Sequence, residues 1–291
     1  MVRNLLIIIC FSTKSNSNLK ILNLIKRNGL GADVVSKGEL MIALKAGINS
    51  KKIVFSGVGK TRSELTYAID KNILLINTES KSEILEIENI AKSQNKKVDI
   101  GIRLNPNTDA KTLKQISTGK KENKFGVSEK TFIEVSKYIK NSKFLNLKCL
   151  SVHIGSQILD HKPYQKMLNV LDKLIKKINF DFEYIDLGGG MGIDYNKDNK
   201  KFNYKKYNQI IKKFLNKHKS KIIFEPGRSI IGDTAILISK IIYIKENSKK
   251  DFIIMDAAMN DFMRPALYGA CLLYTSPSPR DVEESRMPSS A

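Results

Sequence analysis

Apolar and polar positions along the chain alternate between two kinds of segment. Short apolar runs, such as 7–11 (IIICF), fit strands that are buried on both faces of a parallel sheet. Longer stretches, such as 19–30, place leucine and isoleucine on one side and lysine on the other, as amphipathic helices do. Strands that alternate with helices in this way predict a parallel sheet.

Eight strands follow from this pattern. They are expected at residues 7–13, 32–36, 53–56, 74–77, 98–104, 147–154, 182–187 and 221–224, with helices at 19–30, 38–46, 63–71, 81–94, 129–141, 163–178 and 204–218. Eight such units predict an α/β fold of the (β/α)8 barrel type, and an open doubly wound sheet is the alternative. A polar stretch at 107–124 interrupts the pattern and is too long for a simple connection.

The barrel is expected to occupy residues 1–234. Two further strands, at 235–246 and 251–256, are expected to begin a C-terminal β domain that covers 235–270 and is incomplete. The composition changes after that point, because no lysine follows Lys250 and three prolines lie at 277, 279 and 288. Residues 271–291 are therefore expected to be a disordered, non-native tail.

Composition excludes several classes of protein. With 291 residues, of which 42% are hydrophobic, the chain can bury a large core. The net charge of +21 comes mainly from lysines spread over all predicted helices, which favours a solvated surface over a nucleic-acid site. No apolar stretch approaches the roughly 18 residues of a membrane span, and the first apolar run is too short for a typical signal peptide. Cys10, Cys149 and Cys271 lack metal-site spacing, which suggests a reducing cytoplasm.

Polar residues follow most of the predicted strands at their carboxyl ends, where barrel enzymes place their chemistry. These residues are Lys14, Asp33, Ser36, Arg103, His153, Ser156, Gln157, the segment Asp186–Gly192 and the segment Glu225–Arg228. Lys14 is central, because an amine held away from water loses its charge easily and can form a Schiff base with a carbonyl compound.

Each of these residues also has a purely structural interpretation. Lys14 could be a surface lysine, His153 a core histidine and Gly188–Gly190 a tight turn. Together on one rim, they instead offer a reactive lysine, a flat ring for stacking, a glycine-rich phosphate nest and a carboxylate. This combination favours a cofactor pocket.

The ordered set of motifs resembles the pyridoxal-phosphate decarboxylases whose barrel is shared with alanine racemase, and most closely the diaminopimelate decarboxylase branch. The resemblance covers residues 7–270. It is carried by Lys14–Asn18 (KSNSN), Ala32–Ser36 (ADVVS), His153–Gln157 (HIGSQ), Asp186–Gly190 (DLGGG), Glu225–Arg228 (EPGR) and Met259–Ala270 (MNDFMRPALYGA). Ser15 departs from the family, which usually has alanine there.

The resemblance implies pyridoxal 5'-phosphate as the cofactor and no metal. Lys14, His153 and Glu225 would be catalytic: Lys14 would carry the cofactor as a Schiff base, His153 would stack on the ring, and Glu225 would keep the pyridine nitrogen protonated. The other cofactor-binding residues would be Asp33, Arg103, Ser156, Gly189, Gly190, Pro226, Gly227 and Arg228. The substrate would be bound by Arg228, Arg264 and Tyr268.

The activity implied is decarboxylation of meso-2,6-diaminopimelate to L-lysine and CO2 by a cytoplasmic homodimer that binds neither nucleic acid nor membrane. The family's strand ahead of Ile7 and its Cys-Glu-Ser proton-donor motif are not found, so the chain is expected to be a fragment that is inactive alone. Two alternatives stay open: another basic amino-acid decarboxylase of this fold, or a non-catalytic barrel that binds pyridoxal phosphate.

Overall fold

The computed structural model describes residues 7–109, 118–119, 123–195, 201–248 and 251–263. Its strands are β1 (Ile7–Ser12), β2 (Gly31–Val34), β3 (Ile53–Phe55), β4 (Leu75–Thr78), β5 (Val98–Leu104), β6 (Leu145–Val152), β7 (Tyr184–Asp186), β8 (Lys221–Phe224), β9 (Ile241–Lys245) and β10 (Phe252–Met255). Its helices are α1 (Leu19–Arg27), α2 (Lys37–Lys45), α3 (Arg62–Asp70), α4 (Lys81–Ser93), α5 (Glu129–Lys140), α6 (Lys162–Ile178), α7 (Tyr204–Leu215) and α8 (Arg228–Ile231), with short 3-10 helices η1 (Thr13–Ser15) and η2 (Ser50–Lys52). None of these helices is both long and apolar enough to cross a membrane.

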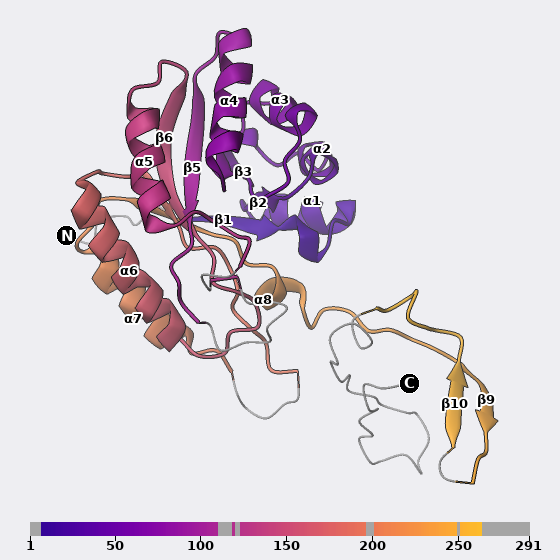
Figure 1. The fold of residues 1–291 in the computed structure, drawn as a ribbon. Coiled ribbons are helices and arrows are strands. Elements are labelled where there is room, and N and C mark those ends of the chain that lie inside the picture. The colour runs from indigo at the N-terminus through magenta and orange to yellow at the C-terminus, as the bar shows by residue number, and fades with distance from the viewer. Residues whose placement is uncertain (1–6, 110–117, 120–122, 196–200, 249–250, 264–291) are drawn as a thin grey trace. The chain divides into compact units, whose positions relative to one another are not determined.

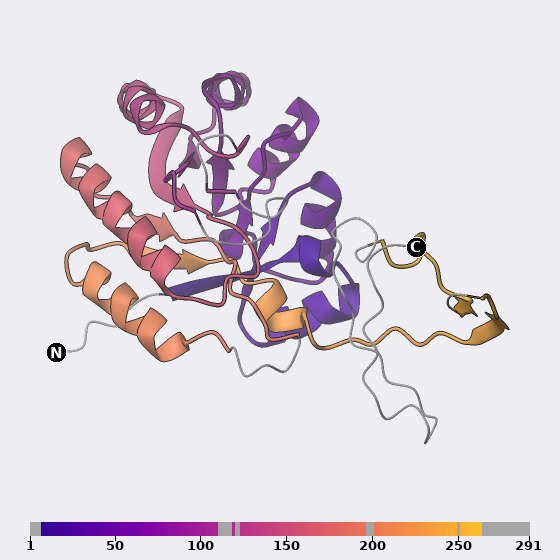
Figure 2. The same cartoon turned by 60° about the horizontal axis from the view of Figure 1, so that its bottom comes forward.

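Strands β1 to β8 pair in chain order and close into a parallel barrel. Closure is made by β1, which pairs with β2 through Cys10 and Gly31 and with β8 through Ile8 and Ile223. The helices lie outside the ring of strands (Figures 1 and 2). The prediction of a closed (β/α)8 barrel is confirmed, and the open sheet is excluded.

Side-chain caps mark where the helices begin. Ser36, Thr61, Ser80 and Ser128 each accept a hydrogen bond from the backbone N–H three residues later, at the start of α2, α3, α4 and α5. At α3, the Glu64 carboxylate also accepts a hydrogen bond from the Thr61 backbone N–H, which completes a capping box. These caps hold the first turn of each helix close to the carboxyl end of the preceding strand.

The inside of the barrel changes from apolar to polar along the strands. Cys10, Val54, Leu75, Cys149 and Ile223 form a buried apolar cluster from five different strands. Side chains two residues apart on a strand point to the same face. The next inward positions on the same strands or just beyond them are all polar: Ser12, Ser56, Asn77, Ser151 and Glu225. The carboxyl end of the barrel therefore has a polar interior.

The boundaries differ from prediction by a few residues. β6 ends at Val152, so His153 lies just beyond the strand, and β7 has only three residues. The helix expected at 204–218 ends at Leu215, and α8 was not predicted.

The described residues divide into two compact units, one formed by 7–193 with 201–232 and the other by residues from 233 onward together with 194–195. In the second unit, β9 and β10 pair antiparallel, with Ile253 opposite Ile244. The two strands predicted after the barrel are present, although β9 is shorter than the expected 235–246. The domain boundary at 234 stays a prediction, and the tail at 271–291 lies outside the described residues.

Candidate active site

Lys14 lies in η1, directly after β1, and faces a carboxylate from β2. Its Nζ is 3.5 Å from Asp33 Oδ2, and the same oxygen accepts a 2.9 Å hydrogen bond from Ser12 Oγ. Asp33 is fully buried, and its other oxygen, Oδ1, has no hydrogen-bond partner among the described residues. An unpartnered buried carboxylate oxygen beside a lysine indicates a site that receives a further polar group.

The pKa of Lys14 is shifted in the direction opposite to expectation. Its side chain is 51% exposed, and the nearby Asp33 carboxylate raises the pKa of its amine, although desolvation and Arg103 act in the opposite direction. The expectation of a dry, easily deprotonated amine is therefore wrong for this structure. The carboxylate stabilises the ammonium form, and Lys14 must release a proton before its nitrogen can act as a nucleophile.

Glu225 follows β8 and is 7% exposed. Its Oε1 accepts a 3.3 Å hydrogen bond from Ser56 Oγ, and its backbone N–H donates to Gly188 O at 2.9 Å. Burial raises the pKa of this carboxyl well above its usual value, and the charges of Asp186 and Asp33 raise it further. Burial therefore favours the protonated form of Glu225.

His153 lies beyond β6 as a neutral ring. Burial, followed by the charges of Arg103 and Lys14, lowers its pKa well below the usual value. The Gly189 N–H donates to His153 Nδ1 at 3.2 Å, which assigns the imidazole proton to Nε2. A neutral ring of fixed tautomer suits stacking on an aromatic cofactor better than an imidazolium would.

The glycine turn after β7 fits tightly against its neighbours. A Cβ at Gly189 would lie 2.1 Å from Glu225 O, and one at Gly190 would lie 2.3 Å from Gly155 O. Gly188 and Gly190 also have positive φ angles, which glycine adopts at little cost. The buried Tyr164 hydroxyl donates a 2.9 Å hydrogen bond to Gly189 O and so stabilises the turn.

We expect Gly189→Ala to weaken cofactor binding about 10- to 100-fold, because forcing an extra methyl into a packed site typically costs about 1–3 kcal/mol. The measurement is titration of the purified chain with pyridoxal phosphate. Gly59→Ala is the matched control, because a Cβ there would meet no atom within 4 Å. Equal affinities for both variants would contradict a role for the close approach at Gly189.

Arg103, on β5, is held by Glu79 after β4. Its NH1 donates to Glu79 Oε1 at 3.0 Å, while Gly126 N–H donates to Oε2 of the same carboxylate at 2.9 Å. The Arg103 guanidinium also lies over the Phe125 ring at 5.0 Å. These contacts fix a planar cation at the carboxyl end of the barrel.

Arg228 begins α8 and donates from Nε to Ser156 Oγ at 3.2 Å. This contact joins two residues that the sequence assigned to phosphate and substrate binding. Pro226 and Gly227 are buried beside them, and the Pro226 carbonyl accepts from Ser12 N–H at 3.0 Å. Arg264 and Tyr268 lie outside the described residues, so their roles stay predictions.

The raised pKa of Glu225 has a consequence for stability. In the unfolded chain the pKa of a glutamate is about 4.3, so the folded protein binds this proton more tightly than the unfolded chain does. The free energy of unfolding therefore falls as the pH rises from the unfolded pKa toward the folded pKa. We expect Glu225→Gln, which mimics the protonated carboxyl, to raise the melting temperature of the cofactor-free protein increasingly from mildly acidic to mildly alkaline pH. Glu134→Gln, at an exposed position, is the control and should gain nothing as pH rises. A constant difference between Glu225→Gln and wild type would contradict the assignment.

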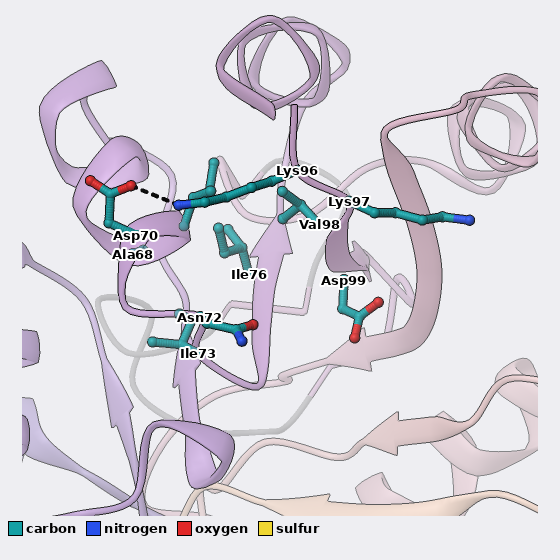
Figure 3. A pocket seen from close by; sticks show the side chains of 10 residues that line it. Ala68, Asp70, Asn72, Ile73, Ile76, Lys96, Lys97, Val98 and Asp99 are labelled. Carbon is teal, nitrogen blue, oxygen red and sulfur yellow. Dashed lines mark hydrogen bonds and ion pairs between the residues drawn. The ribbon is translucent and has the colours of Figure 1, made fainter. Parts of the chain in front are cut away.

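A cavity of about 370 Å³ lies elsewhere, between the end of α3 and the start of β5 (Figure 3). Lys96 crosses it and forms a 3.0 Å ion pair with Asp70. Val98 and Asp99 line it at the amino end of β5, whereas Arg103 is near the carboxyl end of the same strand. The cavity is thus at the opposite end of the barrel from the predicted chemistry and contains none of its residues.

Comparison with known proteins decides the family. Residues 2–232 match the pyridoxal-binding domain of the pyridoxal-dependent decarboxylases. The chain belongs to this family. A diaminopimelate decarboxylase from Pseudomonas aeruginosa is 38% identical over 285 residues, covering 96% of this chain and 68% of the relative. One from Helicobacter pylori is 47% identical over 266 residues, covering 90% of this chain and 65% of the relative.

Solved structures agree with this assignment to the pyridoxal-dependent decarboxylases. Diaminopimelate decarboxylase from Helicobacter pylori, complexed with L-lysine, superposes with a TM-score of 0.87 at 40% identity and covers 97% of this chain and 76% of that one. The enzyme from M. jannaschii, also with L-lysine, gives a TM-score of 0.83 at 37% identity, covering 91% of this chain and 63% of that one. The chain spans about 65% of the length of the first curated relative.

The residues of the site fit the family's cofactor, pyridoxal 5'-phosphate. Lys14 offers an amine beside the unpartnered Asp33 Oδ1, His153 offers a neutral ring, and Glu225 offers a carboxyl whose pKa is raised by burial. A Cβ at Gly189 or Gly190 would meet a carbonyl oxygen of the protein, so packing explains these glycines, and the phosphate nest expected there stays a prediction. One detail differs from the predicted phosphate nest, since the Gly189 N–H donates to His153.

Several residues of the site were given no role from the sequence. They are Ser12, Ser56, Asn77, Glu79, Ser151, Tyr164 and Asp186. The sequence contains a pattern that marks several of these positions. For five strands, a polar residue stands two positions after an apolar residue that faces the inside of the barrel. That spacing alone does not predict the site, because it identifies an inner face only when the strand register is known.

Proposed function

We propose that the chain carries the cofactor site of an enzyme that decarboxylates meso-2,6-diaminopimelate to L-lysine and CO2. The observation that carries the proposal is the arrangement of Lys14, His153 and Glu225 around one end of the barrel, each held by a buried partner. The substrate rests on the relatives named diaminopimelate decarboxylase, at 38–47% identity.

Pyridoxal phosphate, when bound, supplies an electron sink for the electron pair that the departing CO2 leaves on the substrate. The protein's own residues prepare for this in separate ways. Lys14 Nζ would hold the cofactor after releasing a proton, and Asp33 would orient the amine. His153 would present its neutral ring face, and Glu225 would face the pyridine nitrogen with a carboxyl whose protonated form is favoured by burial.

Binding of the phosphate and substrate is proposed for the second half of the rim. Ser156, Gly190, Gly227 and the backbone of Arg228 would receive the phosphate, and the Arg228 guanidinium would bind a substrate carboxylate together with Arg264 and Tyr268. Arg103, fixed by Glu79, would contribute a further positive charge to the same end of the barrel.

The proposed enzyme is a cytoplasmic homodimer. The family resemblance supports the dimer, and the two described cysteines, Cys10 and Cys149, are free and buried, which agrees with a reducing compartment. Sedimentation of the purified protein measures its oligomeric state directly.

The test is an assay of CO2 and lysine formation from meso-diaminopimelate, with ornithine and arginine as competing substrates. Two proteins are compared: the 291-residue chain, and a chimera in which the residues after 234 come from the Helicobacter pylori relative. We expect lysine from the chimera with meso-diaminopimelate only, and little turnover from the 291-residue chain. Turnover of ornithine or arginine at the same rate would overturn the proposed substrate.

A further inference from the structure

A closed ring of hydrogen bonds lies under the proposed cofactor site. Asn77 Nδ2 donates to Asp186 Oδ2 at 2.7 Å and approaches Ser56 Oγ at 3.4 Å. Ser56 Oγ donates to Glu225 Oε1 at 3.3 Å, and Glu225 in turn hydrogen-bonds Asp186. The four residues come from β4, β7 and the segments that follow β3 and β8, so only the closed barrel brings them together.

Asp186 is the member of this ring with the most donors. Besides Asn77, its Oδ2 accepts from Ser151 Oγ at 3.2 Å, and its Oδ1 accepts from Gly188 N–H at 2.9 Å. A carboxylate that accepts several hydrogen bonds is stabilised in its charged form. Burial still raises the pKa of Asp186, but the hydrogen bonds from Glu225, Gly188 and Asn77 counteract this. Asp186 is therefore the acceptor and Glu225 the donor of their shared hydrogen bond.

The barrel makes room for the ring at Gly101, on β5. A Cβ at this position would lie 2.2 Å from Asn77 Oδ1, so any larger residue would displace the amide that orients Asp186. Gly101 is a strand-interior glycine, which normally weakens a strand. Its presence is explained by the space that Asn77 requires.

We propose that Asp186, oriented by Asn77, Ser151 and Gly188, is a positioning residue that holds the proton on Glu225 and so sets the charge that Glu225 presents to the cofactor ring. The proposal rests on the proposed function in one respect, namely that Glu225 faces the pyridine nitrogen. A proton transferred from Glu225 to that nitrogen would leave a carboxylate beside Asp186. Repulsion between the two carboxylates makes Glu225 a stronger base, which draws the proton back to Glu225 and limits protonation of the ring nitrogen.

Other titratable groups also act on Glu225. They are Asp33, whose charge raises the pKa of Glu225, and Lys14, whose charge lowers it. The thiols of Cys10 and Cys149 are also buried nearby. Burial raises the pKa of both thiols well above the usual value, so they are uncharged at neutral pH. Asp33 is connected through Ser12 only to the backbone carbonyl of Glu225 and not to its carboxyl, which makes Asp33→Asn a useful control for a general effect of charge.

The test needs no cofactor and uses the 291-residue chain. Infrared spectroscopy detects the C=O stretch of a protonated carboxyl, and titration follows its loss as pH rises. We expect a buried band that persists at neutral pH, is absent from Glu225→Gln, and disappears at distinctly lower pH in Asp186→Asn than in Asp33→Asn. Retention of the band in Glu225→Gln, or equal shifts in Asp186→Asn and Asp33→Asn, would overturn the proposal.

Asn77→Ala provides a second variant if Asp186→Asn does not fold. It keeps both carboxyls but removes the donor that orients Asp186, so the band should shift in position, and an unchanged spectrum would contradict the ring. In the cofactor-bound chain, an isotope-labelled ring nitrogen should be more fully protonated in Asp186→Asn than in wild type. Covalent attachment at Lys14 is measured separately, so a failure of the proposed function is distinguishable from a failure of this inference.

Discussion

Lys14→Ala is expected to abolish covalent attachment of pyridoxal phosphate to the protein. Borohydride reduction of the wild-type complex, followed by peptide mapping, should place the label on Lys14, and the variant should carry no specific label. The physical reason is position: Lys14 Nζ is half exposed at the carboxyl end of the barrel and lies beside Asp33, at the site that fits the cofactor.

A second lysine near the same end of the barrel shows why position decides the outcome. Lys60 is 1% exposed, and its Nζ donates to Gly57 O, Asn77 O and Glu83 Oε1 at 2.6–2.8 Å. All three of its protons are occupied, so its nitrogen is neither accessible nor free to react. Its contacts instead tie the segment after β3 to β4 and α4.

The rate of attachment should depend on pH. Because Asp33 raises the pKa of Lys14, the amine is mostly protonated near neutral pH. Raising the pH increases the share of neutral amine, and attachment should become faster. Lys20→Ala, at the exposed start of α1, is the control and should label Lys14 like the wild type. Label spread over many surface lysines, or a specific label retained in Lys14→Ala, would remove Lys14 from its proposed role.

Much of the barrel could be predicted because its signals are local. β5 and β8 lie at the predicted residues 98–104 and 221–224, since short apolar runs between turn residues are visible without knowledge of the fold. The strand count then fixed the barrel, and the barrel fixed the end where Lys14, His153 and Glu225 meet. That step needed only the general rule that such sites lie at the carboxyl ends of strands.

The interactions that tune these residues were not predictable in the same way. Asp186 was visible in the Asp186–Gly190 motif, but its partner Asn77 is 109 positions away, and their contact depends on barrel closure. The pKa shift of Lys14 is opposite in direction to the one expected, because an apolar strand end suggests desolvation, whereas the nearby Asp33 carboxylate has the larger effect. Long-range distances of this kind are set by register, which the sequence does not state.

Glu225→Gln is expected to slow decarboxylation of meso-diaminopimelate by on the order of 100-fold or more in the chimera, since losing one preorganised electrostatic contact typically costs that much. Glutamine is nearly the same size and can still accept from Ser56 and donate to Asp186, so the ring of hydrogen bonds is kept. What it cannot do is release a proton and become negative. The pyridine nitrogen would then face a neutral amide, and the electron sink would be weakened.

The diagnostic feature is the contrast between two measurements on the same variant. Glu225→Gln should keep covalent cofactor at Lys14 while turnover falls, and its cofactor-free form should be more stable than wild type at alkaline pH, because it no longer buries an ionisable carboxyl. Asp172→Asn, on the outer face of the barrel in α6, is the control and should leave the rate unchanged. An unchanged rate in Glu225→Gln would remove Glu225 from catalysis, and loss of covalent attachment would show that the substitution damages the pocket. A slower but fully loaded enzyme is the outcome that assigns the effect to the ionisable carboxyl of Glu225, because packing and hydrogen bonding are preserved in the variant.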